Sequence, residues 1–219
     1  MRSWLPFLSL ALLSTLPLAA APAEDTDALV TPAHQLNVDD PAWKDIASGL
    51  QAEKSVTATF TENRWFPFRK IPTVLRGESR VSAEHGLSLH YTDPKEQIVI
   101  IDDKGMLTRA NSRDTPAPDD PRAGAANSAL LHALRFDLAA LSKTFDLYGT
   151  RTGTTWQLAL VPKDDSLRRT LGRISIEGEG PTVRRIELRR SPVQRVEILI
   201  APPQSTAPFS AEELRRFFR

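Results

Sequence analysis

The side chains that commonly perform chemistry are sparse in this sequence, and they do not fall at catalytic spacings. The four histidines are His34, His85, His90 and His132. No two of them stand four residues apart on a helix, so the pattern of a zinc peptidase is missing. There is also no G-x-S-x-G motif, no P-loop and no G-x-G-x-x-G. The sequence therefore predicts no catalytic residue, no metal site and no cofactor, and we expect a protein that is not an enzyme.

Acidic pairs are the other candidates for a metal site. Four pairs of adjacent aspartates fall in predicted turns or loops: Asp39-Asp40, Asp102-Asp103, Asp119-Asp120 and Asp164-Asp165. Adjacent acids in turns are commonly solvated turn residues. A calcium loop is the alternative, but no ladder of oxygen ligands surrounds any of the pairs.

The composition indicates a globular core without covalent cross-links. Of 219 residues, 41% are hydrophobic and 25% are charged, a balance that supports one folded domain. The absence of cysteine excludes disulfides, thiolate metal sites and a cysteine nucleophile. The formal net charge is only +1, so a general electrostatic grip on nucleic acid is not expected.

The first 23 residues are typical of a secretory signal. Arg2 supplies a positive charge, residues 4–18 form a mostly apolar run, and Ala21-Pro22-Ala23 matches a cleavage site. An uncleaved anchor is the alternative, although the run is shorter than the ~20 residues of a membrane span. Residues 24–39 are polar and aperiodic, which predicts a flexible leader. The remainder, 40–219, is expected to be a single domain.

Hydrophobic alternation with a period of two dominates that domain and predicts strands with one buried face. The expected strands cover residues 56–61, 75–82, 87–92, 97–101, 106–107, 156–160, 174–176, 186–188 and 196–200. The outer faces of the late strands carry Arg185, Glu187, Arg189, Arg195 and Glu197. We interpret these as cross-strand charge pairs on a solvated face. A docking face for another protein is the alternative.

Three helical regions accompany the strands. Asp40-Pro41 is a capped helix start, and residues 111–124, which hold three prolines among acids, predict a loop. Residues 128–141 carry leucines at helical spacing with a break near Phe136, and Phe145 can continue that pattern. Ser210 and Glu213 form a capping box before a final helix with an apolar stripe. About ten antiparallel strands in one sheet tend to curl. The expected fold is therefore mainly β, a strongly curved sheet whose concave face is filled or lidded by helices.

The ordered strand motifs resemble the LolA-like family of periplasmic lipoprotein carriers. The matching segments are Val56-Thr-Ala-Thr-Phe60-Thr-Glu, Leu75-Arg-Gly77-Glu-Ser, and the run from Leu87 through Tyr91-Thr-Asp-Pro94 to Gly105, with the tail Ala201-Pro-Pro-Gln. The resemblance is motif-level over residues 44–107 and continues mainly through element order. It implies an unclosed antiparallel β-barrel of about eleven strands with a helical lid and an apolar hollow for acyl chains.

The resemblance also implies a function and its setting. We expect a periplasmic carrier that binds acyl or lipid groups and moves lipidated cargo between the inner and outer membranes. An inner-membrane exporter and an outer-membrane acceptor would be its partners, and the chain would act as a monomer without nucleic acid. The tail over residues 209–218 resembles variant members that accompany lipid or aryl-polyene exporters. The alternative is an accessory interaction domain of an export complex, with a collapsed core and no cargo.

Three sets of residues are the candidate site. The cavity is expected to be lined by apolar-phase strand residues: Phe60, Leu87, Leu89, Tyr91, Ile98, Ile100, Trp156, Leu158, Ile174, Ile186 and Leu188. The lid is expected to present Leu130, Leu131, Leu134 and Leu138. The aromatic connection with Trp65, Phe66 and Phe68 is either an entrance or folded into the core. Where the family has a lid-bonding arginine followed by proline, this chain has Ala83-Glu84, so that latch is absent or rebuilt.

Overall fold

The computed structural model describes residues 28–111, 113–116 and 121–219. The expected signal over residues 1–23 and the pair Asp119-Asp120 lie outside this range. None of the helices in the described ranges is both long enough and apolar enough to cross a membrane.

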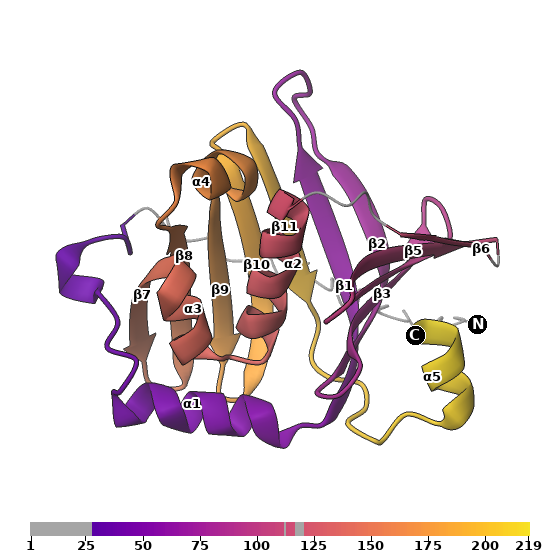
Figure 1. Cartoon of the computed structure of the whole chain (residues 1–219), viewed down its shortest axis with the longest axis horizontal. Coiled ribbons are helices and arrows are strands. Elements are labelled where there is room, and N and C mark those ends of the chain that lie inside the picture. Colours follow the sequence, from indigo (N-terminus) through magenta and orange to yellow (C-terminus); the bar gives the residue numbers. More distant parts are fainter. Residues whose placement is uncertain (1–27, 112, 117–120) are drawn as a thin grey trace, which may run out of the picture.

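One antiparallel sheet of eleven strands forms the body of the described chain (Figure 1). Its spatial order is β6-β5-β4-β3-β2-β1-β11-β10-β9-β8-β7. Every two strands that lie side by side are therefore consecutive in sequence except β1 and β11, and the consecutive strands β6 and β7 form the two opposite edges. The sheet is strongly curved and does not close, as the sequence predicts. The strands are β1 (Ser55–Trp65), β2 (Thr73–Ser82), β3 (Gly86–Asp93), β4 (Gln97–Asp102), β5 (Gly105–Ala110), β6 (Arg113–Pro116), β7 (Phe145–Thr152), β8 (Thr155–Pro162), β9 (Arg173–Glu179), β10 (Thr182–Ser191) and β11 (Gln194–Ile200).

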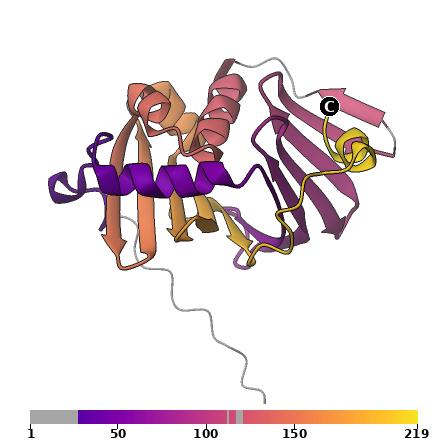
Figure 2. The ribbon, with the colours of Figure 1, turned by 90° about the horizontal axis from the view of Figure 1, so that it is seen from below.

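Five α-helices lie against this sheet in the described part of the chain: α1 (Pro41–Ala52), α2 (Pro121–Leu134), α3 (Leu138–Thr144), α4 (Asp165–Leu171) and α5 (Ala211–Phe217). The Asp40 side chain accepts a hydrogen bond from the amide of Ala42 at 2.9 Å, so it caps α1 as expected. Ser210 and Glu213 form the expected capping box of α5. In Figure 2, α1 lies across the half of the sheet that contains β7 to β10, and α2 lies between this half and the half that contains β1 to β6.

Strand register assigns the two faces of the sheet. Phe60 of β1 pairs with Ile200 of β11 and Gly77 of β2, and Leu89 of β3 pairs with Ser79 of β2. Residues of this phase point to the concave side, where α1, α2, α3 and α4 pack. Residues of the other phase point to the convex side, where α5 packs against β3, β4 and β5.

Three segments differ from the sequence prediction. Phe145 begins strand β7 instead of extending the preceding helix, because Phe145 and Leu147 alternate with the less buried Asp146 and Tyr148. The expected loop over residues 111–124 contains β6 and the first turn of α2. The helix α4 was not predicted, since its seven residues are too few to display a helical period.

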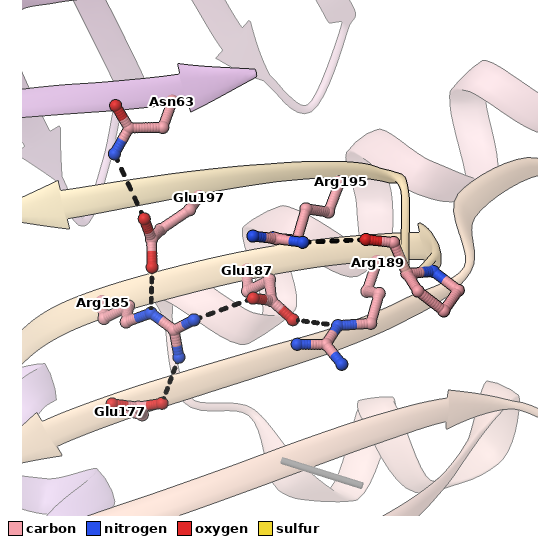
Figure 3. A network of polar contacts seen from close by, with 8 residues as sticks. Asn63, Glu177, Arg185, Glu187, Arg189, Arg195 and Glu197 are labelled. Carbon is pink, nitrogen blue, oxygen red and sulfur yellow. Dashed lines mark hydrogen bonds and ion pairs between the residues drawn. The ribbon is translucent and has the colours of Figure 1, made fainter. Parts of the chain in front are cut away.

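A network of charges covers the convex face of β9, β10 and β11 (Figure 3). Arg185 lies at its centre and donates hydrogen bonds to the carboxylates of Glu177, Glu187 and Glu197. Arg189 adds a bond of 2.6 Å to Glu187. The predicted cross-strand pairing is therefore present, but Arg185 and Glu187 are buried and not solvated. The donors of Arg185 are engaged within the sheet, so a docking partner would have to compete for them.

The described part of the expected leader, residues 28–39, contacts the domain. Leu29 is buried, Gln35 forms an isolated antiparallel bridge with Tyr148 of β7, and the amide of Leu36 donates to the carbonyl of Leu147 at 2.8 Å. The flexibility expected for residues 24–39 stays a prediction.

Candidate functional site

An apolar cavity lies on the concave face, between α2 and the centre of the sheet. Its volume is about 180 Å³. Side chains from α1, α2 and five central strands form most of its wall, and they are nearly all aliphatic. They include Leu50, Val56, Ala58, Val81, Leu87, Leu89, Leu130, Leu134, Val183, Ile186, Leu188, Ile198 and Ile200. We call this space the central cavity.

The cavity exists because α2 bridges the two halves of the curved sheet without filling the space between them. Leu130 and Leu134 stand one helical turn apart and both face the cavity. Leu131 instead packs against the β1–β3 half, beside Phe60, Leu87 and Leu89. Helix α2 therefore covers the cavity while Leu131 packs it against one half of the sheet.

A second hollow of about 310 Å³ continues the cavity toward the C-terminal ends of α1 and α2. It shares Leu50, Glu53, Val81 and Leu134 with the central cavity, so the two spaces adjoin. Its rim includes Ala83 in the β2–β3 turn. We call it the α1 mouth.

Polar contacts hold α2 at the α1 mouth. The amide of Gln51 donates to the carbonyl of Arg135 at 3.1 Å. The Arg135 guanidinium donates to the carboxylate of Asp103 at 3.2 and 3.4 Å. Both contacts are exposed, so each contributes little to the free energy of unfolding.

A third hollow, of about 430 Å³, lies beside α4, at the end of β1 and next to the turn that joins β10 to β11. It shares Leu188 with the central cavity. Its lining residues include apolar side chains together with Arg64, Arg190 and Arg195, although strand register turns the Arg195 side chain toward the convex face beside Trp65. We call it the arginine pocket.

A buried acid lies at the inner wall of the arginine pocket. Glu62 is only 2% exposed, and it accepts hydrogen bonds from the Tyr91 hydroxyl at 2.5 Å and from the Arg64 guanidinium. Burial and the adjacent Glu62 charge raise the pKa of Tyr91 well above its usual range, so the phenol stays protonated and keeps donating. Burial alone would lower the pKa of Arg64, but the hydrogen bond and charge of Glu62 outweigh it and raise that pKa. The charge of Glu62 is thus neutralised within this cluster.

A concave sheet roofed by a helix over an apolar cavity is the geometry that the sequence motifs indicate. The family model described as outer membrane lipoprotein carrier protein LolA-like matches residues 39–212. The chain belongs to this LolA-like family. No curated protein sequence matches it.

Solved structures with a similar fold have low sequence identity to this LolA-like chain. A LolA superfamily protein from Nitrosomonas europaea is 7% identical, with a TM-score of 0.44 over 81% of this chain and 97% of that chain. A chain of the MucA/MucB complex of Pseudomonas aeruginosa is 16% identical, with a TM-score of 0.44 over 81% of this chain. This LolA-like chain spans 60% of the length of that chain. LprF from Mycobacterium bovis is 14% identical, with a TM-score of 0.34 over 78% of this chain and 93% of that chain.

The predicted cavity residues divide into three groups in this LolA-like fold. Four of them line the central cavity: Leu87, Leu89, Ile186 and Leu188. Five more lie on the same concave face but are packed into the core beside it: Phe60, Tyr91, Trp156, Leu158 and Ile174. The last two, Ile98 and Ile100, do not face the concave side.

The register of β4 explains that correction. Ile98 pairs with His90 and Ile100 with Ser88, so both share the convex phase and pack against α5. Val99 and Ile101 are the concave residues of this strand. Because β4 is apolar on both faces, the sequence shows that both are covered but does not show which face is the inner one.

The predicted lid and entrance residues also separate. Leu130 and Leu134 face the central cavity and Leu131 lines the α1 mouth, whereas Leu138 belongs to α3 and is packed in the core. Trp65 and Phe66 line the arginine pocket, and Phe68 is 82% exposed. Ala83 lies at the rim of the α1 mouth, and Arg135 lines the same hollow.

Several cavity residues were missed, although the sequence carried a signal for most of them. Val56, Ala58 and Val81 share the alternation of their strands, and Leu50 lies on the apolar stripe of α1. The arginine pocket had no such signal, because its three arginines come from strand ends whose approach depends on the β1–β11 pairing.

The described residues also bear on metal binding. Across residues 28–111, 113–116 and 121–219, no three His, Cys, Asp or Glu side chains are grouped so as to hold a metal ion.

Proposed function

We propose that this LolA-like chain is a periplasmic carrier that holds an acyl chain on its concave face and delivers lipidated cargo from the inner to the outer membrane. The observation that carries the proposal is the central cavity, an aliphatic space left open under α2. An inner-membrane exporter and an outer-membrane acceptor would be its partners, and the carrier would act as a monomer without catalysing a reaction.

Desolvation would supply the binding free energy. An acyl chain of sixteen carbons has about fifteen methylenes, each contributing about 0.8 kcal/mol when buried, or about 12 kcal/mol before costs. Ordering the chain and moving the lid offset part of this, which keeps release possible.

The size of the closed cavity supports a carrier whose lid moves when cargo binds. An apolar cavity of about 150 Å³ holds a molecule such as benzene. The central cavity, at about 180 Å³, therefore accommodates only a short part of an acyl chain while α2 is closed. Binding a longer chain requires Leu130 and Leu134 to leave the cavity wall, so lid and cargo compete for one apolar surface.

A filled-cavity variant tests the proposal. Ala58 is buried in the cavity wall and Thr59 is exposed on the opposite face of the same strand. In a titration with a fluorescent fatty-acid analogue, Ala58→Leu should weaken binding by about tenfold or more, the effect of losing about 1.4 kcal/mol. Thr59→Leu is the matched control and should bind like the unmodified chain.

The alternative is an accessory interaction domain that carries no lipid. Absence of saturable binding by the unmodified chain would support that function and overturn the carrier proposal. Mass spectrometry of lipids that co-purify with the protein would identify the cargo if binding is found.

A further inference from the structure

The most exposed apolar side chains of the described residues are concentrated at one end of the sheet. Among the large hydrophobic residues, the three with the greatest exposure are Phe68 at 82%, Ile71 at 69% and Val193 at 56%. Phe68 and Ile71 lie in the turn that joins β1 to β2, and Val193 lies in the turn that joins β10 to β11. The two turns are adjacent, because Trp65 at the end of β1 pairs with Arg195 of β11.

The β1–β2 turn projects beyond the rest of the sheet (Figure 1). We call this turn, residues 66–72, together with the β10–β11 turn, residues 192–193, the hairpin tip. The amide of Arg69 donates to the carbonyl of Phe66 at 3.0 Å, and the Phe66 and Phe68 rings stack with their centres 5.5 Å apart. These contacts give the turn a defined shape, so Phe68 is held at the surface by the structure of the turn itself.

The charge around the hairpin tip has a single sign. Residues 63–73 and 188–196 contain six basic side chains and no acid, in a chain whose net charge is only +1. Two of the six are ion-paired with buried glutamates. Arg190 lies on the concave side and Arg195 on the convex side, so positive charge flanks the tip on both faces. Within the described ranges, four of the six have no carboxylate partner: Arg69, Lys70, Arg190 and Arg195.

This combination suits a membrane surface better than another protein. Aromatic and aliphatic side chains flanked by Lys and Arg are typical of protein segments that enter the headgroup layer of a bilayer. The apolar groups reach the acyl boundary, while the basic groups attract anionic lipids and keep their charged ends in water. A stable protein interface needs about 800 Å² on each partner, and three exposed apolar side chains on two short turns offer less than that.

We propose that the hairpin tip docks on a bilayer surface that contains anionic phospholipids. Phe68 and Ile71 insert among the headgroups, and Arg69, Lys70 and Arg190 bind lipid phosphates. This inference goes beyond the proposed carrier function, because none of these side chains lines the central cavity. The arginine pocket lies directly behind the tip and shares Leu188 with the central cavity, so docking places this end of the concave surface at the membrane.

Co-sedimentation with vesicles tests the docking. One set of vesicles is phosphatidylcholine alone, and the other contains phosphatidylglycerol as a quarter of its lipid. The unmodified chain should bind the anionic vesicles at least tenfold more tightly, since each basic side chain near such a surface strengthens binding about fivefold. Salt at about 1 M should weaken this binding strongly, because the screening length falls to about 3 Å.

Two double variants separate the apolar contribution from the charged one. Phe68→Ser with Ile71→Ser should weaken binding to the anionic vesicles by about tenfold or more, because two apolar side chains no longer enter the lipid. Arg69→Gln with Lys70→Gln should weaken it by about twentyfold and reduce its dependence on salt. All four side chains are exposed, so both variants should melt like the unmodified chain.

Matched controls lie elsewhere on the surface. Leu199→Ser removes an exposed apolar side chain from the convex face of β11, and Lys95→Gln with Arg113→Gln removes two exposed charges from the other half of the sheet. Both controls should bind the anionic vesicles like the unmodified chain. The proposal is overturned if the tip variants also bind like the unmodified chain. It is equally overturned if the unmodified chain does not bind the anionic vesicles, which would leave the tip to a protein partner.

Fluorescence identifies the part of the molecule that enters the lipid. Anionic vesicles with bromine on the acyl chains should quench the Phe68→Trp variant more than the unmodified chain, because the introduced indole reaches the acyl boundary. Binding without this additional quenching would mean that another surface docks, and the proposal would be wrong. Both tip variants should keep their affinity for a fatty-acid analogue. Absence of fatty-acid binding by the unmodified chain would overturn the carrier function and leave the docking of the tip standing.

Discussion

Helices α2 and α5 cover opposite faces of the same half of the sheet, and they do so in different ways. Both lie across β3, β4 and β5 or their edges and use large apolar side chains. Beneath α2 there is a cavity, while α5 inserts Phe217 and Phe218 into close contact with Ile98, Ile100 and Leu107. The contrast is between a helix that covers empty space and a helix that is packed tightly against its strands.

The attachment of α5 is polar as well as apolar. Arg109 donates to the backbone carbonyls of Arg215, Arg216 and Phe218, which are carbonyls at a helix end that lack intrahelical partners. Arg219 donates two bonds of 2.6 Å to the Asp102 carboxylate. A seven-residue helix is marginal by itself, so these contacts are what keep α5 folded.

The polar contacts described for α2 are fewer and lie at its C-terminal end. They include the Gln51–Arg135 and Arg135–Asp103 contacts at the α1 mouth, and the described packing of α2 against the sheet is otherwise mainly apolar. Apolar contacts are non-directional, and an acyl chain can replace them at little net cost. From this comparison we expect α2, and not α5, to be the helix that opens in the proposed carrier.

The largest effect should come from removing the anchor of α5. Phe218 is 1% exposed, and Phe218→Ala should lower the free energy of unfolding by about 3–5 kcal/mol through lost burial and a new cavity. Thermal melting measures this loss. Because α5 lies on the convex face, the affinity of the folded variant for a fatty-acid analogue should not rise. A rise in affinity would show that α5 also restrains the hollow.

Weakening the packing of α2 should cause a smaller loss of stability, accompanied by a rise in lipid affinity. Leu131→Gln removes a buried contact worth about 2–3 kcal/mol from the closed state. The melting temperature should fall while lipid affinity rises, because less closed-state free energy is lost on opening.

The matched control for that change is Leu141→Gln in α3, a leucine that is 1% exposed in the core away from the cavity. It should lower the melting temperature without raising lipid affinity. If Leu131→Gln behaved in the same way, α2 would be static core and the carrier mechanism would be wrong.

The smallest expected effect is on the stability of the fold at low pH. Burial alone would raise the pKa of Asp102, but hydrogen bonds from Arg219 and the Lys104 amide outweigh it and lower that pKa. A carboxylate with a lowered pKa stabilises the fold above the ordinary value of about 4, and this contribution is lost as the pH falls through the lowered pKa.

Melting at pH 6 and pH 3 measures this term. Asp102→Asn does not titrate, so it should lose less stability between the two pH values than the unmodified chain, by about 1 kcal/mol at most. Equal losses would mean that the Asp102–Arg219 pair does not contribute to holding α5.

Much of this fold could be predicted because its signals are local. Alternation located most strands, and the Asp40 and Ser210 caps located two helix starts. The predictions that failed concern residues whose local pattern is compatible with two different structures. Phe145 continues a leucine pattern, yet it begins a strand, and the direction in which β4 faces depends on its register with β3.

The site was less predictable than the fold. Alternation identified an inner face, and Leu87, Leu89, Ile186 and Leu188 do line the cavity. Whether an inner residue borders empty space or packs solidly depends on where the helices rest. Trp156 was predicted for the cavity, but Phe136 lies edge-on to its ring at 5.2 Å, and that contact joins residues that no local pattern connects.

The contacts of residues 35 and 36 with β7 cover an edge of the sheet to which another copy of the chain could otherwise pair. A sheet that does not close leaves two outermost strands, and unpaired strand edges invite another chain to add to them. At one end, β6 is four residues long and ends at Pro116. At the other, the Gln35–Tyr148 bridge and the Leu36–Leu147 hydrogen bond occupy the free side of β7. Without residues 28–38, the eight residues of β7 would be open to strand addition, and self-association would be expected before unfolding.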